Sequence, residues 1–402
     1  MSRRAISLFI LIILLQLLCY IGFCHGRLRD SDLAGLKEIR NGLYDLPGSV
    51  FFQSWNFESS DPCNSFSGVM CRQIDGVFRV QTLNLGSWLA SSPGLKGELS
   101  PSLGNLTALR QLIVFPGRVT GQIPDTLGNL HKLEFLGISQ NCLSGPIPWS
   151  FKKLQCLRTL DLSYNQLQGS IPAGLTHNPN LKILVLGHNN IMGKIPSIEC
   201  QLLHMDLSHN MLSGDLPLLP SSLQYLSLTQ NVLSGSLENL SSLNRLKHLD
   251  LSLNQFIGSI PASLFGLHQL SNVFLQRNRL SGNLRIQAGS VTSIDTIDLS
   301  HNNLSGELSP ILANARNIYL NHNHLTGMVP LEYVRKIYTG RIRTFYIGHN
   351  YFSAFPLAAG SPLPISGSLC IRYNCMDPPV KSPCPLSSGG REKRPTYECK
   401  NF

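Results

Sequence analysis

Two rows of ionisable side chains recur along the chain and are its first candidates for chemistry. The first row comprises four aspartates that each begin the tripeptide Asp-Leu-Ser: Asp161, Asp206, Asp250 and Asp298. An enzymatic function would have to rest on scattered carboxylates and histidines such as these. We favour a simpler interpretation, in which each Asp is a polar residue in an exposed position between two inward-facing leucines.

The second row consists of histidines that each immediately precede an asparagine: His188, His209, His301, His322 and His349. The unperturbed pKa of histidine is about 6.5, so such a row is a candidate pH-sensitive rim of a binding surface. That hypothesis predicts a change in partner binding between about pH 5 and pH 7. The alternative, which we favour, is a polar position tolerated within a repeat.

No established catalytic or cofactor-binding motif accompanies these rows. The chain lacks a GxSxG elbow, an HExxH helix, a P-loop and a GxGxxG segment. We therefore expect no enzymatic activity, no cofactor and no bound metal.

The residues that must position both rows belong to a repeat. Segments aligned on an asparagine share the pattern LxxLxLxxNxLxGxIP, as in residues 157–172, with spacings of 21 to 27 residues. The aligned asparagines are Asn141, Asn165, Asn189, Asn210, Asn231, Asn254, Asn278, Asn302, Asn323 and Asn350. Two weaker copies precede them, with Trp88 and Gly117 in place of asparagine. About twelve repeats are therefore expected over residues 79–356.

Each repeat predicts one short strand and one polar ladder position. The leucines of LxxLxL point inward, and the residues between them are exposed on the other face. Neighbouring strands pair in parallel about 4.8 Å apart. The asparagine side chain can bond backbone groups where the chain leaves the strand. Because one repeat cannot bury its own apolar face, the copies must stack into a solenoid.

The extended motif resembles the plant-specific class of extracellular leucine-rich repeats, over about residues 30–356. The Gly-x-[Ile/Leu/Val]-Pro segments that carry the resemblance are Gly121–Pro124, Gly145–Pro148, Gly169–Pro172, Gly193–Pro196, Gly214–Pro217, Gly258–Pro261 and Gly327–Pro330. Departures are an insertion at Ser87–Gly94, a missing proline in the copies at Gly235, Gly282 and Gly306, and a last repeat without its glycine. The resemblance implies an α/β fold: a right-handed leucine-rich-repeat solenoid with a parallel β-sheet on the concave face and cysteine-containing caps at both ends.

The N-terminal cap is expected over residues 27–78. Residues 31–44 have the apolar spacing of a short amphipathic helix, with Ser31 or Asp32 as its N-cap. The resemblance implies a disulfide between Cys63 and Cys71.

A Pro-rich C-terminal cap or tail is expected over residues 357–402, and it contains Cys370, Cys375, Cys384 and Cys399. Four cysteines allow three pairings, among which the sequence does not choose. We favour a disulfide-bonded cap over a zinc site. Of Cys142, Cys156 and Cys200 within the repeats, Cys142 and Cys156 can pair if a loop brings them together, and buried reduced thiols are an equal alternative.

The N-terminus predicts a secreted protein. Arg3 and Arg4 precede an apolar run, and small residues follow it, so residues 1–26 have the pattern of a cleaved signal peptide. The alternative is an uncleaved signal anchor that tethers the chain to the membrane. The formal charge of +10 becomes +8 on cleavage, with 31 basic against 23 acidic residues. Outside the cell we expect this charge to attract acidic polysaccharide, anionic membrane or acidic protein, and not nucleic acid.

Large apolar or aromatic residues replace the usual small polar ones beside several strand leucines. With one arginine at a strand exit, they are the predicted ligand-binding residues of the concave face: Ile113, Phe115, Phe135, Val185, Tyr225, Phe274, Arg277, Tyr319 and Tyr346. Ordinary variation within the repeat is the alternative. Asn105, Asn239 and Asn303 begin N-glycosylation sequons.

The resemblance implies a secreted or cell-surface receptor-like protein that binds an extracellular peptide, protein or polysaccharide. A membrane receptor kinase would then be its partner in defence or developmental signalling. The rival function is inhibition of a cell-wall-degrading enzyme, as in the polygalacturonase inhibitors, although this chain has more repeats and a longer tail than those proteins.

Overall fold

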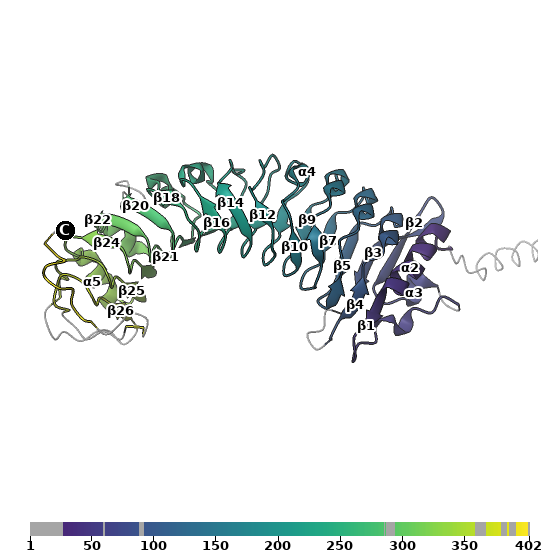
Figure 1. The fold of residues 1–402 in the computed structure, drawn as a ribbon, viewed down its shortest axis with the longest axis horizontal. Coiled ribbons are helices and arrows are strands. Elements are labelled where there is room, and N and C mark those ends of the chain that lie inside the picture. Colours follow the sequence, from purple (N-terminus) through teal and green to yellow (C-terminus); the bar gives the residue numbers. More distant parts are fainter. Residues whose placement is uncertain are drawn as a thin grey trace, which may run out of the picture.

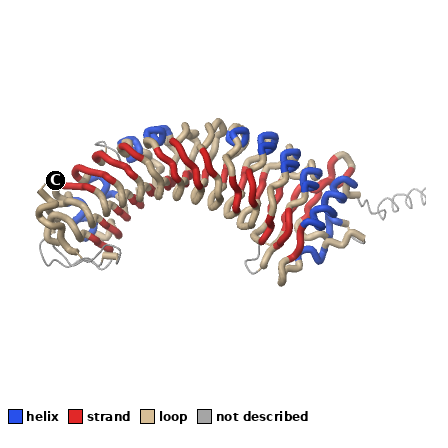
Figure 2. Tube along the Cα trace, in the orientation of Figure 1, coloured by secondary structure: helices blue, strands red, loops and turns tan. Residues whose placement is uncertain are grey.

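Short strands line the inner side of an arch, and short helices run along its outer rim (Figures 1 and 2). The computed structural model describes residues 27–58, 61–87, 92–284, 286, 294–357, 367–378, 384–385 and 391–400. The predicted signal segment at residues 1–26 and the predicted repeat position Trp88 lie outside these residues. The arch is the curved solenoid that the repeat pattern predicts.

One sheet of fourteen strands forms the concave face. Its first two strands are antiparallel, and from β3 onward every pair is parallel. The strands are β2 (Val69–Ile74), β3 (Val77–Leu85), β5 (Gln111–Val114), β7 (Phe135–Gly137), β9 (Thr159–Asp161), β11 (Ile183–Val185), β13 (His204–Asp206), β15 (Tyr225–Ser227), β17 (His248–Asp250), β19 (Asn272–Phe274), β21 (Thr296–Asp298), β23 (Asn317–Tyr319), β25 (Thr344–Tyr346) and β26 (Ser368–Cys370). In each three-residue strand the middle residue is buried beneath the sheet, as the alternation of the sequence predicts.

A second series of short strands forms the flank of the arch, and from β8 onward each of them follows the asparagine of its repeat. Its members are β1 (Leu43–Asp45), β4 (Leu95–Glu98), β6 (Arg118–Thr120), β8 (Ser144–Pro146), β10 (Gln166–Gln168), β12 (Met192–Gly193), β14 (Met211–Asp215), β16 (Val232–Ser234), β18 (Ile257–Gly258), β20 (Arg279–Asn283), β22 (Asn303–Glu307) and β24 (His324–Thr326). The buried leucines between the two series form one continuous core. Stacking of repeats, and not any single repeat, therefore buries the apolar surface.

The outer rim carries short helices. The α-helices are α2 (Asp30–Gly42), α3 (Pro62–Ser65), α4 (Ala173–Thr176) and α5 (Leu331–Tyr338). The 3₁₀ turns are Phe51–Ser54, Pro101–Asn105, Asp125–Asn129, Trp149–Lys153, Glu238–Ser242, Ala262–Gly266 and Pro310–Asn314. Proline often stands directly before or at the start of these turns, where its missing N–H costs no hydrogen bond.

The predicted asparagine ladder is confirmed. Asn165 Oδ1 accepts a hydrogen bond from the Leu143 amide of the preceding repeat at 3.0 Å. Its Nδ2 donates to the carbonyl oxygens of Ile138 at 2.7 Å and Leu162 at 3.2 Å. The same bonds recur up to Asn350, which is fully buried. Each asparagine thus satisfies backbone groups that would otherwise be buried without partners.

The sheet and the ladder extend one repeat beyond the predicted limit at residue 356. Strand β26 pairs in parallel with β25, and Asn374 donates to the carbonyl of Ile347 and accepts from the amide of Phe352. The segment expected to be the tail therefore begins with a thirteenth strand of the parallel part of the sheet, counted from β3. Its segment escapes the pattern because Cys370 stands between the inward-facing Leu369 and Ile371, and the usual preceding leucine is missing.

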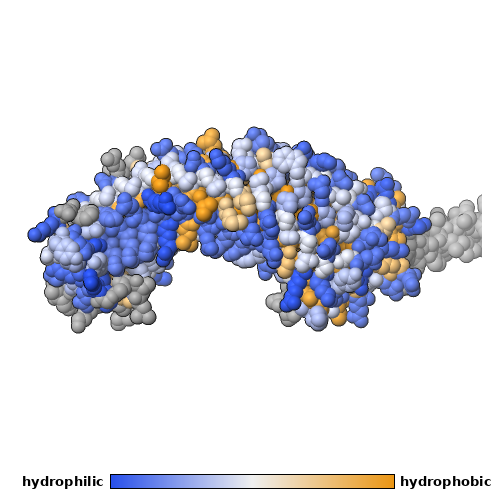
Figure 3. Space-filling model, in the orientation of Figure 1, coloured by the Kyte–Doolittle hydropathy of each residue, from blue (hydrophilic) through white to orange (hydrophobic). Residues whose placement is uncertain are grey.

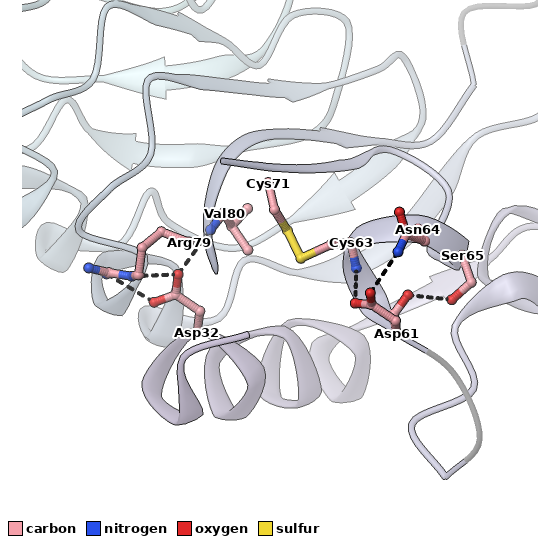
Figure 4. Close-up of a disulfide and its surroundings, with 8 residues drawn as sticks. All are labelled: Asp32, Asp61, Cys63, Asn64, Ser65, Cys71, Arg79 and Val80. Carbon is pink, nitrogen blue, oxygen red and sulfur yellow. Dashed lines mark hydrogen bonds and ion pairs between the residues drawn. A yellow bond between two sulfur atoms is a disulfide. The ribbon is translucent and has the colours of Figure 1, made fainter. Parts of the chain in front are cut away.

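The N-terminal cap uses Asp32 differently from the prediction. The helix begins at Asp30, its N-cap is Arg29 without a capping side chain, and Asp32 lies buried in the first turn. Both Asp32 oxygens accept from the Arg79 guanidinium, at 2.9 and 3.0 Å, and Oδ2 also accepts from the Val80 amide (Figure 4). The prediction of an N-cap is wrong because this carboxylate joins the helix to β3 instead of closing its own turn.

The rest of this cap is an aromatic cluster held by one disulfide. Trp55 stacks on Phe66 at 5.1 Å and donates its indole N–H to the Ser67 carbonyl. Cys63 and Cys71 form the disulfide, and it joins α3 to the antiparallel strand β2 (Figure 4).

Two disulfides and one arginine organise the C-terminal cap. The pairs are Cys370–Cys384 and Cys375–Cys399, one of the three pairings that the sequence leaves open. The Arg394 guanidinium lies 4.0 Å from the Tyr351 ring centroid and 4.5 Å from that of Tyr373. It also pairs with Glu398 and donates to the Asn350 carbonyl.

The three cysteines within the repeats are unpaired thiols, so Cys142 and Cys156 do not form a disulfide. Cys142 is half-buried, Cys156 is exposed and Cys200 is buried. Burial raises the pKa of Cys200, which makes this thiol a poor nucleophile.

Candidate functional site

The concave sheet presents three aligned columns of side chains. Residues at the first and third positions of each strand flank the buried leucine, and strand register places them beside their counterparts in the next repeat, as for Thr159, Ile183 and His204. We call these the first-position and third-position columns. The residue directly before each ladder asparagine forms an exit column. Any ligand lying in the arch meets these columns.

All nine predicted ligand-binding residues lie on this face, but they do not form one cluster. Five belong to the third-position column: Ile113, Val185, Phe274, Tyr319 and Tyr346. Phe135 and Tyr225 are in the first-position column, Phe115 follows β5, and Arg277 is in the exit column. Arg277 is exposed and the other eight are half-buried.

At the N-terminal end, Phe115 lines a pocket of about 530 Å³ between the cap and the first repeats. Phe51 and Asn84 are also among its lining residues. Ile113 and Phe135 lie on the adjoining strands, and Gly137 makes room for the Phe135 ring, because a Cβ at Gly137 would lie 2.9 Å from it. This end of the face offers apolar surface and no ionisable group in the pocket.

The aspartate row acts first as a set of turn caps. Oδ1 of each aspartate accepts from the amide of the serine two residues later, at 2.9 to 3.0 Å. Asp161 and Asp250 also accept from the serine hydroxyl. These bonds explain the recurring Asp-Leu-Ser, because the carboxylate satisfies an amide where the strand ends. Their register places the four carboxylates in every second strand of the third-position column.

Three rings stack in parallel at the centre of the first-position column. The Tyr225 ring lies 4.2 Å from His204 and 4.5 Å from His248, with interplanar angles of 5° and 4°. Phe274 lies 5.7 Å from His248 in a tilted contact. Burial lowers the pKa of both histidines. The nearby carboxylates Asp206 and Asp250 raise the pKa, but their effect is smaller than that of burial. Both imidazoles are therefore neutral at pH 7 and can accept hydrogen bonds.

The exit column has an unusual backbone conformation. Every residue of it from Gln140 to Tyr373 has a positive φ, between 52° and 57°. Histidine is among the residues that tolerate this left-handed region, and glycine is not required. The recurring histidine before asparagine thus has a backbone cause, which supports the interpretation as a tolerated polar position.

The exit-column histidines also stack. Tyr164, His188 and His209 form one stack at 4.0 Å intervals, and His301, His322 and His349 form another at 4.1 to 4.2 Å. Burial, followed by the neighbouring His349, His301 and Arg277, lowers the pKa of His322 to about 4. Because one strand spacing separates the rings, protonation of one disfavours protonation of the next.

At the C-terminal end, the Tyr319 and Tyr346 rings meet edge to face at 5.3 Å. Arg277, His322 and Tyr346 line an adjoining pocket of about 210 Å³, which the Cys370–Cys384 bridge borders. Three predicted ligand-binding residues, Arg277, Tyr319 and Tyr346, therefore lie close together at this end.

Each glycosylation sequon lies outside the concave face. Asn105 ends the 3₁₀ turn Pro101–Asn105, and Asn303 begins β22; both are exposed. Asn239 is half-buried and its Nδ2 donates to the Leu216 carbonyl at 2.9 Å, a bond that a glycan on this nitrogen would replace. Glycosylation stays a prediction at all three.

His204 and His248 are not among the residues predicted from the sequence to bind a ligand, and the stacking of their rings on Tyr225 was not predicted either. The signal was available, since aligning the residue before each central leucine brings His204, Tyr225 and His248 into consecutive copies. It is hard to recognise because the column contains no constant residue type.

The flank of the arch also carries apolar patches, visible at mid-arch in Figure 3, and exposed apolar residues of its strands include Met192, Met211, Val232 and Ile257.

Comparison with known families and proteins agrees with this architecture. The leucine-rich-repeat N-terminal domain family matches residues 29–72, a family of two leucine-rich repeats matches residues 156–200, and single leucine-rich repeats match residues 132–154, 245–267 and 293–315. A probable leucine-rich repeat receptor-like protein kinase of Arabidopsis thaliana is 38% identical over 77 residues, 19% of this chain and 6% of the kinase. A second probable kinase of this type is 31% identical over 92 residues, 23% of this chain and 12% of the kinase.

Solved structures of plant proteins share the fold. The complex of PEPR1 with AtPEP1 has a TM-score of 0.68 at 28% identity, covering 87% of this chain and 52% of that chain. The plant peptide hormone receptor RGFR1, in complex with RGF2, has a TM-score of 0.63 at 29% identity, covering 70% and 46%. A plant ice-binding protein has a TM-score of 0.55 at 28% identity, covering 84% and 98%.

These findings define the protein as a capped leucine-rich-repeat solenoid with the fold of plant receptor ectodomains. The chain contains a leucine-rich-repeat N-terminal domain and leucine-rich repeats, and over part of its length it is homologous to plant leucine-rich-repeat receptor-like kinases. It spans only a small part of those two kinases and about half of the two peptide-bound receptor chains. Among the helices of the described residues, we find none with the length and apolarity that crossing a bilayer requires.

Proposed function

We propose that the protein recognises an extracellular peptide or protein ligand with its concave face and acts together with a partner receptor. The observation that carries this proposal is the series of half-buried aromatic rings on the parallel concave sheet: Phe135, Tyr225, Phe274, Tyr319 and Tyr346. Aromatic side chains are enriched among the residues that contribute most to binding.

The comparisons support the same function. One structure of similar fold, at 29% identity, is the plant peptide hormone receptor RGFR1 in complex with RGF2, and another, at 28% identity, is PEPR1 with AtPEP1. A curved sheet suits an extended ligand, because a chain laid along the arch crosses one strand about every 4.8 Å and contacts a new repeat each time. A role in defence or developmental signalling, through a receptor kinase, extends this proposal.

A pull-down from cell-surface extract, with residues 27–402 as bait, tests it. The test variant is Phe274→Ala/Tyr319→Ala, which removes two rings from the third-position column. Its matched control is Trp149→Ala, since Trp149 is an exposed aromatic residue on a 3₁₀ turn outside the concave sheet.

We expect partners captured by the wild type to be lost with the double variant and retained with the control, at unchanged thermal stability. Equal recovery by all three proteins would contradict the assignment of the concave face. Dose-dependent inhibition of wall-degrading glycosidases by the wild type would instead favour the inhibitor function.

A further inference from the structure

The centre of the concave face brings together titratable groups of which the proposed function uses only Tyr225. Three consecutive strands present His204 and Asp206, Tyr225 and Ser227, and His248 and Asp250 at their first and third positions. The pattern is symmetric about β15, with a histidine and an aspartate on either side of the tyrosine. We call His204, Asp206, Tyr225, His248 and Asp250 the central plate.

The rings of the central plate are fixed by their own packing. Tyr225 lies between the two imidazoles, within 4.5 Å of each and nearly parallel to both. Parallel rings stacked along the solenoid direct their edges, and not their faces, to the concave side. Those edges carry the imidazole nitrogens and the phenol oxygen.

The two carboxylates are also oriented before any ligand arrives. Asp206 and Asp250 bind the amides of Ser208 and Ser252 at 3.0 Å, and Asp250 also accepts from the Ser252 hydroxyl. Every one of these bonds uses Oδ1, and within the described residues no hydrogen bond occupies Oδ2 of either aspartate. Two strand spacings separate the carboxylates, roughly 10 Å. A cation above β15 therefore lies about 5 Å from each carboxylate, within the range of their electrostatic attraction.

The remaining members of the plate add acceptors to this negative site. Burial, then the carboxylates of Asp206 and Asp250, raises the pKa of Tyr225, so its hydroxyl stays protonated and polar. Burial lowers the pKa of His204 and His248, so their imidazoles add no positive charge at pH 7. The plate thus presents two negative charges and neutral polar ring edges.

Cationic residues border the plate where the strands begin. Lys182 immediately precedes β11 and donates to the Gln201 carbonyl at 3.3 Å, and Lys247 immediately precedes β17; Lys182 is half-buried and Lys247 is exposed. These lysines repel any cation, and the repulsion grows with the number of charges, so a single basic side chain among neutral residues is opposed less than a polycation is. Charge complementarity therefore selects the occupant.

We propose that the central plate binds one arginine or lysine side chain of an extended peptide partner, with Asp206 and Asp250 as its charge partners and Tyr225 as a polar contact. This inference rests on the proposed function and names the chemistry of its ligand. Planar guanidinium, with five donors, suits two carboxylates and ring nitrogens better than ammonium does. Carboxylate contacts to a charged donor are also stronger than neutral ones.

The experiment is an NMR titration of residues 27–402 labelled at histidine, because His204 and His248 report directly on the plate. The probe is the tripeptide acetyl-Ser-Arg-Ser-amide, and its matched neutral probe has citrulline, an uncharged isostere, in place of arginine. We expect the His204 and His248 ring signals to shift with the arginine probe and not with citrulline, and the shift to weaken as salt is raised.

Two variants locate the site. Asp206→Asn/Asp250→Asn keeps an acceptor for the serine amides but removes both charges, and we expect it to weaken probe binding at least about tenfold. Asp161→Asn makes the same change in the same column of β9, beside Val185 and two strands before Asp206, and should bind as the wild type does. Equal shifts with citrulline, equal loss in Asp161→Asn, or unchanged binding in the double variant would each overturn the inference.

The test of the arginine-binding site can fail or succeed independently of the pull-down that tests the proposed function. If partner capture is lost in Phe274→Ala/Tyr319→Ala but retained in Asp206→Asn/Asp250→Asn, the concave face recognises ligands without a basic anchor. In that case the proposed function stands and this inference is wrong. If the arginine probe binds the plate but the wild type captures no partner, the inference stands and the proposed function is wrong.

Discussion

The two ends of the solenoid solve one problem by different means. Each must cover the exposed core of a terminal repeat. The N-terminal cap does so with a helix, an antiparallel strand, an aromatic cluster and a buried ion pair, and it has one short-range disulfide. The described residues of the C-terminal cap form no helix or named strand after β26, and this cap relies on two disulfides and a stacked arginine. Core-forming sequence and covalent links are therefore interchangeable means of ending a repeat array.

The buried ion pair of the N-terminal cap should give the largest effect. Removing one charge with Asp32→Asn leaves Arg79 buried without its partner, and we expect a loss of about 3–5 kcal/mol in the free energy of unfolding. Urea unfolding followed by tryptophan fluorescence, to which the buried Trp55 contributes, measures it. Asp30→Asn is the control, because its pair with Arg27 is 77% and 82% exposed and should change stability by under about 1 kcal/mol. Similar losses in both variants would show that Asp32 does not act through burial.

Disulfide removal should affect the C-terminal cap more than the N-terminal one. Cys375 and Cys399 are separated by 24 positions, and Cys63 and Cys71 by 8. Loop-closure entropy then predicts losses of about 3.5 kcal/mol for Cys375→Ser/Cys399→Ser and about 2.5 kcal/mol for Cys63→Ser/Cys71→Ser. Hydrogen exchange would show at which end the strands open. The reverse order would mean that the aromatic cluster depends on its disulfide.

The stacked arginine of the C-terminal cap should contribute less. Arg394→Ala removes two ring contacts, the Glu398 pair and a bond to the Asn350 carbonyl, and we expect a loss of about 2 kcal/mol. Arg394→Lys should recover only part of it, since ammonium lacks the planar face. The adjacent Lys393→Ala is the control, because its pair with Asp377 is exposed. Thermal unfolding by circular dichroism distinguishes them, and equal shifts would contradict the role of stacking.

The smallest expected difference between the two ends is their response to pH. The pKa of His322 is lowered to about 4 in the folded state, and burial is the main cause. The unfolded chain therefore binds more protons between about pH 6.5 and pH 4, and stability contributed by neutral His322 is lost as the pH falls through this window.

His322→Asn tests this at constant backbone, because asparagine also tolerates positive φ. We expect it to reduce the fall in unfolding free energy from pH 6.5 to pH 4 by about 1 kcal/mol, after allowing for solvent screening. His131→Asn, at an exposed position outside both stacks, is the control. An unchanged pH profile in His322→Asn would show that the stack does not govern acid sensitivity.

The repeats could be predicted from the sequence because their signal is local. Leucine and asparagine spacing defines which residues are buried, where each strand lies and which side chain bonds the backbone, and the structure confirms all three. The thirteenth strand was missed because Cys370 and a lost leucine obscure the same pattern. The candidate site was predicted only as a face, because the residue types that vary within a repeat carry no periodic signal.

Sequence by itself thus determined the solenoid, its concave sheet and the presence of a cap at each end. Tertiary structure decided which residues meet across repeats: Asp32 with Arg79, 47 positions apart, and Tyr225 between His204 and His248. It also decided the pairing of Cys370, Cys375, Cys384 and Cys399. The physical reason is that the spacing within one repeat already determines which leucines are buried. A contact between repeats also depends on strand register and on which strands, distant in sequence, lie next to each other.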